Sequence, residues 1–343
     1  MQSEYTPQFQ AALDRIRIAA KDGYTSDAQV AFRDEMLALG PYERINNLYR
    51  IRPKRPVPGE PSRMQFFRAN KMQEHYLKNH TNRDLILKMR QGGVTTLSCL
   101  TALDTSLWEF GTHSAIIAHV KENVRKYFQI SKMAFRSFIK DWGNFYPVTE
   151  QVDNVNELKI RELGSSLLVA TETKGLTLDF LHIAEAAFVE DDRISESVES
   201  VPMSARVIQE TTPDTASGMF YDTWMLGQNN EPSIYKNFFY PWWYQYPEEE
   251  DIPSLLARAD NLKYTEEEEV LISQHNLGLE HIIWRRMKIA EKGGDKDEFN
   301  RLYPEDPLTC FLSGSRCVFP MSVQASLWRS EKKPAFTGDL LIA

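Results

Sequence analysis

The first part of the chain places apolar residues at the spacing of amphipathic helices. Phe9, Leu13 and Ile16 share one face of a first helix, and Phe32 and Met36 share one face of a second. Polar residues fill most of the positions between them, as expected for helices that cover a core and also meet solvent. The pattern predicts a helical N-terminal extension over residues 1–49.

A basic, proline-rich segment separates this extension from the rest of the chain. Residues 50–63 contain four prolines and five Arg or Lys side chains. Proline lacks a backbone N–H and fixes the chain in extended conformations, so the segment breaks the helical pattern. We interpret it as a linker, and a solvated connector is favoured over a nucleic-acid contact.

From residue 64 onward, apolar runs of strand length alternate with longer segments of helical periodicity. This alternation is typical of an α/β fold, and it predicts a core with a mainly parallel central sheet over residues 64–247. The expected strands are 85–87, 114–119, 178–184 and 205–210, and segment 157–173 alternates like two paired strands that turn at Gly164. A short helix is expected at 74–78, a longer one after Gly93 and another over about 120–128.

The last third of the chain changes in character. An aromatic-rich stretch and an acidic, proline-bounded segment at 247–253 lead into Thr265-Glu-Glu-Glu268, which has the form of a helix capping box. A second helical pattern covers 280–290 and ends at Gly293-Gly294. Two helices are therefore expected here.

Composition narrows the class of protein. The 343 residues are 42% hydrophobic and 26% charged, which is ordinary for a globular protein. No apolar run reaches the roughly 18 residues that span a bilayer, and the N-terminus lacks the pattern of a signal peptide, so we expect no membrane association and a cytoplasmic protein. The three cysteines have no metal-binding spacing and suit a reducing compartment. A net charge of −8 argues against coating nucleic acid by bulk charge but allows a local basic surface.

The most informative stretch is Lys88-Met-Arg-Gln-Gly-Gly-Val-Thr-Thr96, between an expected strand and an expected helix. Against the phosphate-binding pattern G-x-x-x-x-G-K-[ST], Gly93 and Thr95 match, but Val94 stands in place of the lysine. Lys88, at the first position, could still reach phosphate oxygens while the Thr95 hydroxyl binds Mg²⁺. The alternative is a structural Gly-Gly turn, which is common between a strand and a helix.

Polar residues follow two further strands. Glu185 ends the strand 178–184, and Thr211 and Thr212 follow the strand 205–210. In parallel sheets the carboxyl ends of strands carry the working residues, so Glu185 could activate water and the two hydroxyls could sense a γ-phosphate. A charged residue at a strand end is also often simply the first solvated one. Upstream, the amide of Gln73 could read an adenine edge, although such a glutamine is more often a surface residue.

A basic cluster follows the second expected strand. Residues 121–140 include six Lys or Arg residues and only one acidic residue, with aromatic residues interleaved. This composition is typical of a DNA-facing surface, and an exposed helical face over a core stripe is an equal alternative. The candidate DNA contacts are Lys121, Arg125, Lys126, Lys132 and Arg136.

Taken together, these stretches resemble the ATPase region of the large terminase subunit, the DNA-packaging motor of tailed phages and prophages. The resemblance covers about residues 66–319. It rests on the loop Lys88-x-Arg90-Gln91-x-Gly93-x-Thr95, on His182-Ile-Ala-Glu185-Ala-Ala-Phe188, on Thr211-Thr212-Pro213, and on a tail with Glu280-His-Ile-Ile-Trp-Arg-Arg286, Tyr303-Pro304, Ser313-Gly314 and Val318-Phe319.

The resemblance implies a role for each matched residue. Glu185 corresponds to the catalytic carboxylate, Arg90 to a cis arginine on the γ-phosphate, and Thr211 and Thr212 to the coupling motif. ATP and Mg²⁺ are the implied cofactors, with Thr95 as the metal ligand and Gln73 at the adenine. The implied nucleotide-binding residues are Gln73, Lys88, Arg90, Gln91, Gly92, Gly93, Val94, Thr95 and Thr96.

The resemblance also implies architecture and partners. The fold would be an ASCE-type P-loop NTPase with a small lid subdomain at 248–320, and residues 321–343 would begin a linker to a nuclease domain that is absent here. The function would be an ATP-hydrolysing motor that translocates double-stranded DNA into a procapsid in the host cytoplasm. The expected assembly is a homo-oligomeric ring that works with a portal ring and the small terminase subunit.

Two departures from the family pattern qualify this prediction. Many members carry an aspartate before the catalytic glutamate to hold the Mg²⁺ shell, whereas this chain has Ala184. Asp179 cannot readily replace the missing aspartate, because it lies roughly 16–20 Å from position 184, at the other end of the expected strand. The chain also shows no cluster of nuclease aspartates, so we expect no nuclease activity. A helicase or DNA-repair ATPase, and a nucleotide-binding module that has lost catalysis, are the alternative functions.

Overall fold

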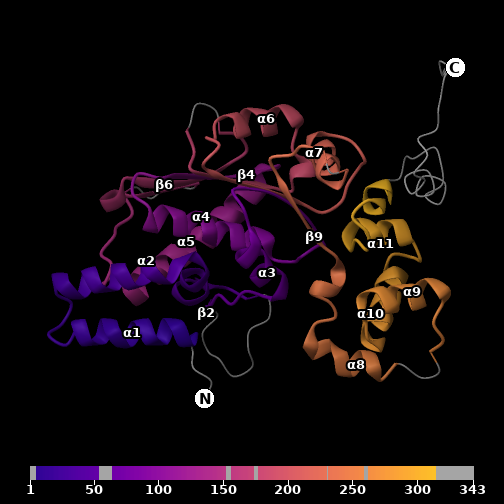
Figure 1. Cartoon of the computed structure of the whole chain (residues 1–343), viewed down its shortest axis with the longest axis horizontal. Coiled ribbons are helices and arrows are strands. Elements are labelled where there is room, and N and C mark those ends of the chain that lie inside the picture. Colours follow the sequence, from indigo (N-terminus) through magenta and orange to yellow (C-terminus); the bar gives the residue numbers. More distant parts are fainter. Residues whose placement is uncertain are drawn as a thin grey trace.

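A central seven-stranded sheet organises the fold in the computed structural model, which describes residues 5–53, 64–151, 156–173, 177–229, 231–258 and 262–313 (Figure 1). The strand order is β5-β6-β4-β7-β8-β3-β9, and every neighbouring pair is parallel except β5 with β6. The strands are β3 (Arg83–Lys88), β4 (His113–Ala118), β5 (Glu157–Ile160), β6 (Ser165–Ala170), β7 (Phe180–Ala184), β8 (Arg206–Thr211) and β9 (Lys236–Tyr240). The predicted α/β class with a mainly parallel sheet is confirmed.

Helices cover both faces of this sheet (Figure 1). One face carries α4 (Val94–Trp108) and α5 (Lys121–Trp142), with α1 (Pro7–Ala19), α2 (Ser26–Leu48) and α3 (Lys71–Asn79) outside or beside them. The other face carries α6 (Asp191–Glu199) and α7 (Met219–Gln228). Short 3₁₀ helices lie at Arg161–Leu163, Ala186–Phe188, Trp242–Tyr244, Glu249–Asp251 and Thr309–Ser313. None of the described helices is long and apolar enough to cross a membrane.

Alternate residues along each strand enter different hydrophobic cores. Ile86 and Ile208 pack in the core beneath α4, whereas Leu85 and Val207 pack in the core beneath α6 and α7. This follows from the two-residue period of a strand, and both faces are apolar because helices bury both. The same alternation decides which side chains at the carboxyl edge point toward α4.

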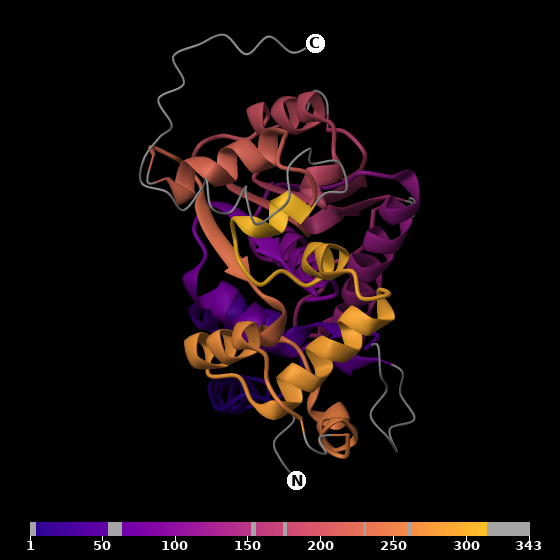
Figure 2. The same cartoon turned by 90° about the vertical axis from the view of Figure 1, so that its right-hand side faces the viewer.

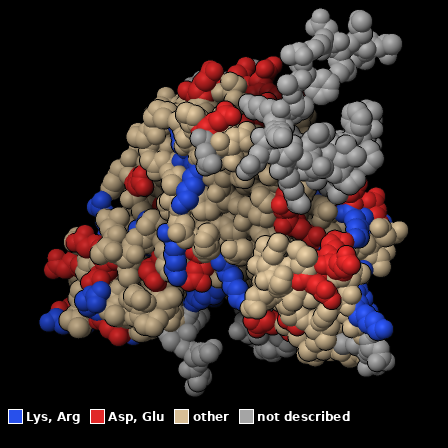
Figure 3. Space-filling view, turned by 45° about the vertical axis from the view of Figure 1, so that its right-hand side comes forward, with Lys and Arg blue, Asp and Glu red and all other residues tan. Residues whose placement is uncertain are grey.

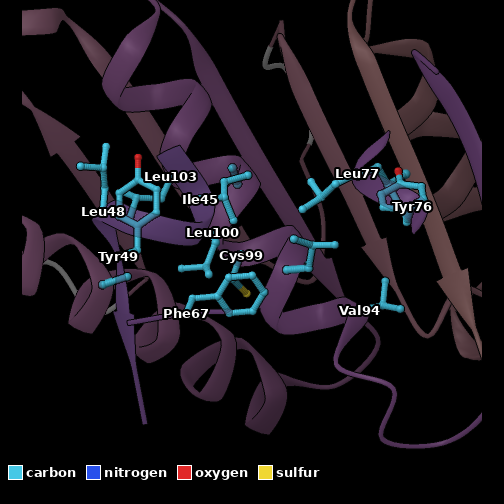
Figure 4. Close-up of a cluster of buried hydrophobic side chains, with 14 of the residues drawn as sticks. Ile45, Leu48, Tyr49, Phe67, Tyr76, Leu77, Val94, Cys99, Leu100 and Leu103 are labelled. Atoms are coloured by element: carbon cyan, nitrogen blue, oxygen red, sulfur yellow. The ribbon is translucent and has the colours of Figure 1, made fainter. Parts of the chain in front are cut away.

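The segment of the predicted N-terminal extension forms α1 and α2, which pack on one another, and α2 also packs on α4. Apolar side chains of α2, α3 and α4 meet in one cluster (Figure 4). A buried ion pair joins α2 to α4: the Arg44 guanidinium donates to Asp104 at 2.7 Å, and the Tyr49 hydroxyl donates to the same carboxylate at 2.7 Å. Residues 54–63 of the predicted linker lie outside the described residues, while β1 (Arg50–Ile51) pairs with β2 (Gln65–Phe66) on either side of them.

Replacing Asp104 with alanine is expected to lower the free energy of unfolding by about 3–5 kcal/mol, because the buried Arg44 guanidinium would lose its counter-charge. Urea denaturation measures this change. Asp14→Ala is the matched control, since Asp14 pairs with Arg17 on the surface at 59% side-chain exposure and should change stability by less than about 0.5 kcal/mol. A loss below about 1 kcal/mol in Asp104→Ala would show that the pair does not anchor the extension.

Four described helices lie together beside the sheet, in the segment where a lid is predicted (Figure 2), and we refer to this group as the lid. They are α8 (Ile252–Leu256), α9 (Glu266–His275), α10 (Leu279–Glu291) and α11 (Lys296–Leu302). The predicted capping box is present, with the Thr265 hydroxyl accepting from the Glu268 N–H and the Thr265 N–H donating to the Glu268 carboxylate. Trp242, just after β9, stacks on Trp284 of α10 at 4.9 Å between ring centroids. The aromatic-rich stretch thus packs the lid onto the sheet. Residues 314–343 lie outside the described part.

Candidate nucleotide-binding site

Lys88 is the last residue of β3 and points toward the start of α4. It lies two residues after Ile86, so the strand alternation places both side chains on the α4 face. Its side chain is only 5% exposed. Val94, at the position where the usual pattern has lysine, is the first residue of α4 and is buried in the same core. A lysine there would enter an apolar core, so the displaced Lys88 is the residue positioned to supply the charge.

Hydrogen bonds from α3 brace the loop between β3 and α4. The Asn70 side chain donates to the Gly92 carbonyl at 3.2 Å, and the Gln73 side chain donates to the Gly93 carbonyl at 2.8 Å. Gly93 has φ +82°, and a Cβ at this position would lie 2.7 Å from Gln73 Nε2, so both conformation and space demand glycine. With the loop carbonyls held by α3 and no side-chain cap on α4, the first N–H groups of α4 form a site for an anion.

The Gln73 side chain is bonded to its own helix start and to the loop. Its carbonyl oxygen accepts from the Asn70 N–H at 2.9 Å, which closes a capping box, and its NH₂ group donates to Gly93. The side chain is buried, with both ends engaged in the loop. Its contact with adenine stays a prediction.

Lys88 lies between two carboxylates that come from neighbouring strands. Its Nζ is 3.2 Å from Glu185 Oε1 and 3.0 Å from Glu210 Oε2. Burial alone would lower the pKa of Lys88, but the two carboxylates outweigh it and raise that pKa. For the Glu210 carboxyl, burial acts in the other direction and would raise the pKa. Lys88 and the nearby His182 outweigh burial and hold the pKa of Glu210 well below its usual range. The lysine is cationic and Glu210 anionic at neutral pH.

Glu185 follows β7 directly, as predicted, and its backbone is in the left-handed region (φ 55°, ψ 50°). A non-glycine residue in this region at a strand end is uncommon and is found at functional sites. The Thr212 hydroxyl donates to Glu185 Oε2 at 3.4 Å, and the Thr211 hydroxyl accepts from the Ala187 N–H. Thr211, Thr212 and Glu185 thus meet because β8 lies between β3 and β7. Asp179 is at the opposite end, where it accepts from the His113 N–H.

Glu210 is the residue that the sequence reasoning missed. It is fully buried, and it accepts a hydrogen bond from the Thr95 hydroxyl at 2.9 Å. His182 Nε2 lies 3.6 Å from the same oxygen, Oε1. One signal could have revealed it: Glu210 is a charged residue near the end of an expected strand, directly before two threonines already selected as candidates.

The chain is similar in structure to large terminase ATPase domains of several phages. The Thermus phage P74-26 large terminase ATPase domain shares 17% identity over 56% of this chain and 87% of that one, with a TM-score of 0.44. The HK97 bacteriophage large terminase shares 14% identity over 76% of this chain, with a TM-score of 0.48. A large terminase from a thermophilic bacteriophage, solved in complex with ATP-γ-S, shares 12% identity over 54% of this chain, with a TM-score of 0.40. The match covers 53% of the HK97 chain and 45% of the chain in the ATP-γ-S complex.

Comparison of the sequence itself finds no matching protein-family profile and no matching curated protein.

Three further loop residues complete the description of the site. Arg90 is exposed, its N–H donates to the Leu302 carbonyl at 2.8 Å, and its carbonyl accepts from the Tyr246 hydroxyl at 3.4 Å. Gln91 has φ 65°, and Thr96 lies in the first turn of α4. The backbone at Arg90 is therefore bonded directly to the lid helix α11 and to the segment that leads into the lid.

A cleft of about 770 Å³ lies between the start of α3 and the aromatic segment after β9. Asn70 and Lys71 at the start of α3 line one side, and Trp243, Tyr244 and Tyr246 line the other. The aromatic faces suit a flat heterocycle. Five carboxylates also line the cleft and would repel a phosphate group: Glu74, Glu248, Glu249, Glu250 and Glu280. In the described part of the chain, no three His, Cys, Asp or Glu side chains converge as a metal site.

The basic cluster lies along α5, which extends to Trp142, well past the predicted end. Lys121, Arg125, Lys126 and Arg136 are exposed. Lys132 is buried and pairs with Glu150 at 3.2 Å, so it does not present its charge to solvent. Elsewhere, acidic and basic side chains intersperse on the face shown in Figure 3. The DNA contact of α5 stays a prediction.

Proposed function

We propose that this chain is the ATP-hydrolysing part of a large terminase subunit, a motor that translocates double-stranded DNA. One observation carries the proposal: Lys88, Glu185 and Thr95 reach one point at the carboxyl edge of the sheet although they come from separate segments. A cation, a carboxylate and a helix N-terminus around one point are the parts that phosphoryl transfer requires. The terminase resemblance of the matched motifs supports the choice of DNA as the substrate.

In this proposal each group acts through its position. The N-terminus of α4 and Lys88 bind the β- and γ-phosphates, and the base enters the cleft beside Tyr244 and Tyr246. Bound Mg²⁺ would neutralise developing charge on the phosphates, with the Thr95 hydroxyl among its oxygen ligands. Glu185 orients and deprotonates the attacking water, and Thr212 keeps its carboxylate in place. Arg90, exposed at the loop, can reach the γ-phosphate.

The proposed partners follow from the terminase role. Double-stranded DNA, a portal ring, the small terminase subunit and other copies of the chain in a ring would complete the motor. Movement would reach the DNA through the lid, because the backbone at Arg90 is bonded to α11. The exposed basic side chains of α5 are the candidate DNA contacts.

ATP turnover by the purified chain, measured with and without long duplex DNA, tests the proposal. We expect turnover that duplex DNA stimulates, and a stimulation that falls steeply with salt because phosphate contacts release counterions. Arg125→Ala with Arg136→Ala should weaken the stimulation, whereas Arg15→Ala, which breaks a surface pair with Glu35 on the N-terminal extension, should not. Strand separation of a forked duplex would favour the helicase alternative. No turnover at high protein concentration with DNA would favour the module that has lost catalysis.

A further inference from the structure

The missing aspartate before Glu185 has a counterpart on the neighbouring strand. Ala184 of β7 and Glu210 of β8 are register partners. Register partners in a parallel pair present their side chains on the same face, about 4.8 Å apart. A glutamate is one methylene longer than an aspartate, so the carboxylate of Glu210 can reach the place that a carboxylate on residue 184 would occupy.

The contacts of Glu210 are those expected of that missing carboxylate. Its Oε1 accepts from the Thr95 hydroxyl at 2.9 Å, and Thr95 is the metal-binding position of the phosphate loop. Its Oε2 faces Lys88 Nζ at 3.0 Å, and the described residues place no second donor on that oxygen. Glu210 is thus a fully buried anion whose second oxygen retains acceptor capacity beside the phosphate loop.

Positions 184 and 210 cannot both carry an ionised carboxylate at low cost. Ala184 and Glu210 are both fully buried. Two carboxylates on adjacent strands in such a site would repel, and one would have to take up a proton. The small side chain at 184 and the charged one at 210 therefore form a complementary pair.

We propose that Glu210 positions the Mg²⁺ of the bound nucleotide, by orienting Thr95 and the metal's water shell, in place of a carboxylate at residue 184. This inference rests on the proposed nucleotide-binding function. The donor set fits the ion: Mg²⁺ takes hard oxygen ligands, keeps several waters and usually binds through one or two carboxylates plus phosphates. A hydroxyl and a carboxylate at hydrogen-bond distance provide such oxygens.

Binding of ATPγS by calorimetry, in EDTA and in Mg²⁺, tests the assignment without relying on turnover. For the wild type we expect Mg²⁺ to increase affinity. In Glu210→Gln that increase should shrink by about 10–100-fold, the usual effect of losing a carboxylate that orients a metal ligand. The electron paramagnetic resonance spectrum of Mn²⁺ bound with ATPγS should change in the same variant. Moving the carboxylate back, in Ala184→Asp/Glu210→Gln, should recover most of the metal-dependent increase.

Glu150→Gln is the matched control, because it removes a carboxylate from a Lys–Glu pair between α5 and the segment before β5. If Glu210→Gln keeps the full effect of Mg²⁺, Glu210 is only a partner of Lys88 and the assignment is wrong. If that single variant does not fold, the double variant decides: a restored metal effect supports the assignment, and its absence overturns it. A wild type that does not bind ATPγS at all would instead contradict the proposed function.

Discussion

Glu185→Gln is expected to reduce the ATP turnover number by about 10²–10⁴-fold, the contribution of a well-placed general base. Glutamine keeps the shape of the side chain and can still accept from Thr212, but it cannot take a proton from water. Nucleotide binding should persist, because Lys88 and the N-terminus of α4 are unchanged. Steady-state hydrolysis, with ATPγS affinity measured alongside, gives both quantities.

Glu190→Gln provides the comparison for this variant. Glu190 lies five residues further along the chain, pairs with Arg193 on the surface and is 79% exposed. Its replacement should leave turnover within a factor of about two, since exposed pairs contribute little. Equal turnover in Glu185→Gln and the wild type would mean that hydrolysis, if present, uses another base, and it would favour the nucleotide-binding module.

Lys88→Ala is expected to abolish measurable turnover and to weaken ATPγS binding by at least about 100-fold. Lys88 is the cation that faces both Glu185 and Glu210. Without it two carboxylates would face the phosphates, so attraction would turn into repulsion. Loss of a single charged group that stabilises transferring phosphate costs about 10³–10⁵-fold in rate in other enzymes.

A loss of folding must be separated from this loss of binding. Removing Lys88 leaves Glu210 buried without its cation, at a cost of about 3–5 kcal/mol in stability. Arg44→Ala has the same physical consequence at Asp104, away from the loop. Both variants should melt earlier than the wild type, but only Lys88→Ala should lose ATPγS binding at a temperature where both are folded. Full binding by Lys88→Ala would contradict the role of the displaced lysine.

Local patterns in the sequence predicted most of the sheet. Segments 85–87, 114–119 and 205–210 lie within one or two residues of β3, β4 and β8, because apolar runs bounded by turns are set by neighbours in the chain. β9 was not predicted. Its aromatic residues Phe238, Phe239 and Tyr240 are consecutive, so its composition gives no simple alternation of apolar and polar positions. The predicted end of α5 was too early, although buried residues continue at helical spacing through Phe135 and Phe138 to Trp142.

The sequence alone determined the parts of the site that depend on order along the chain: Lys88 before a glycine loop, Glu185 after a strand, and Thr211 and Thr212 after another. Only the tertiary structure decided which of these strands are neighbours. That choice depends on pairing between residues far apart in sequence, and it brought Glu210 beside Ala184 and Thr95. It also turned the Gln73 amide into the loop and buried Lys132. The sequence shows which side chains carry a charge, but tertiary packing decides which of them are buried and which groups they contact.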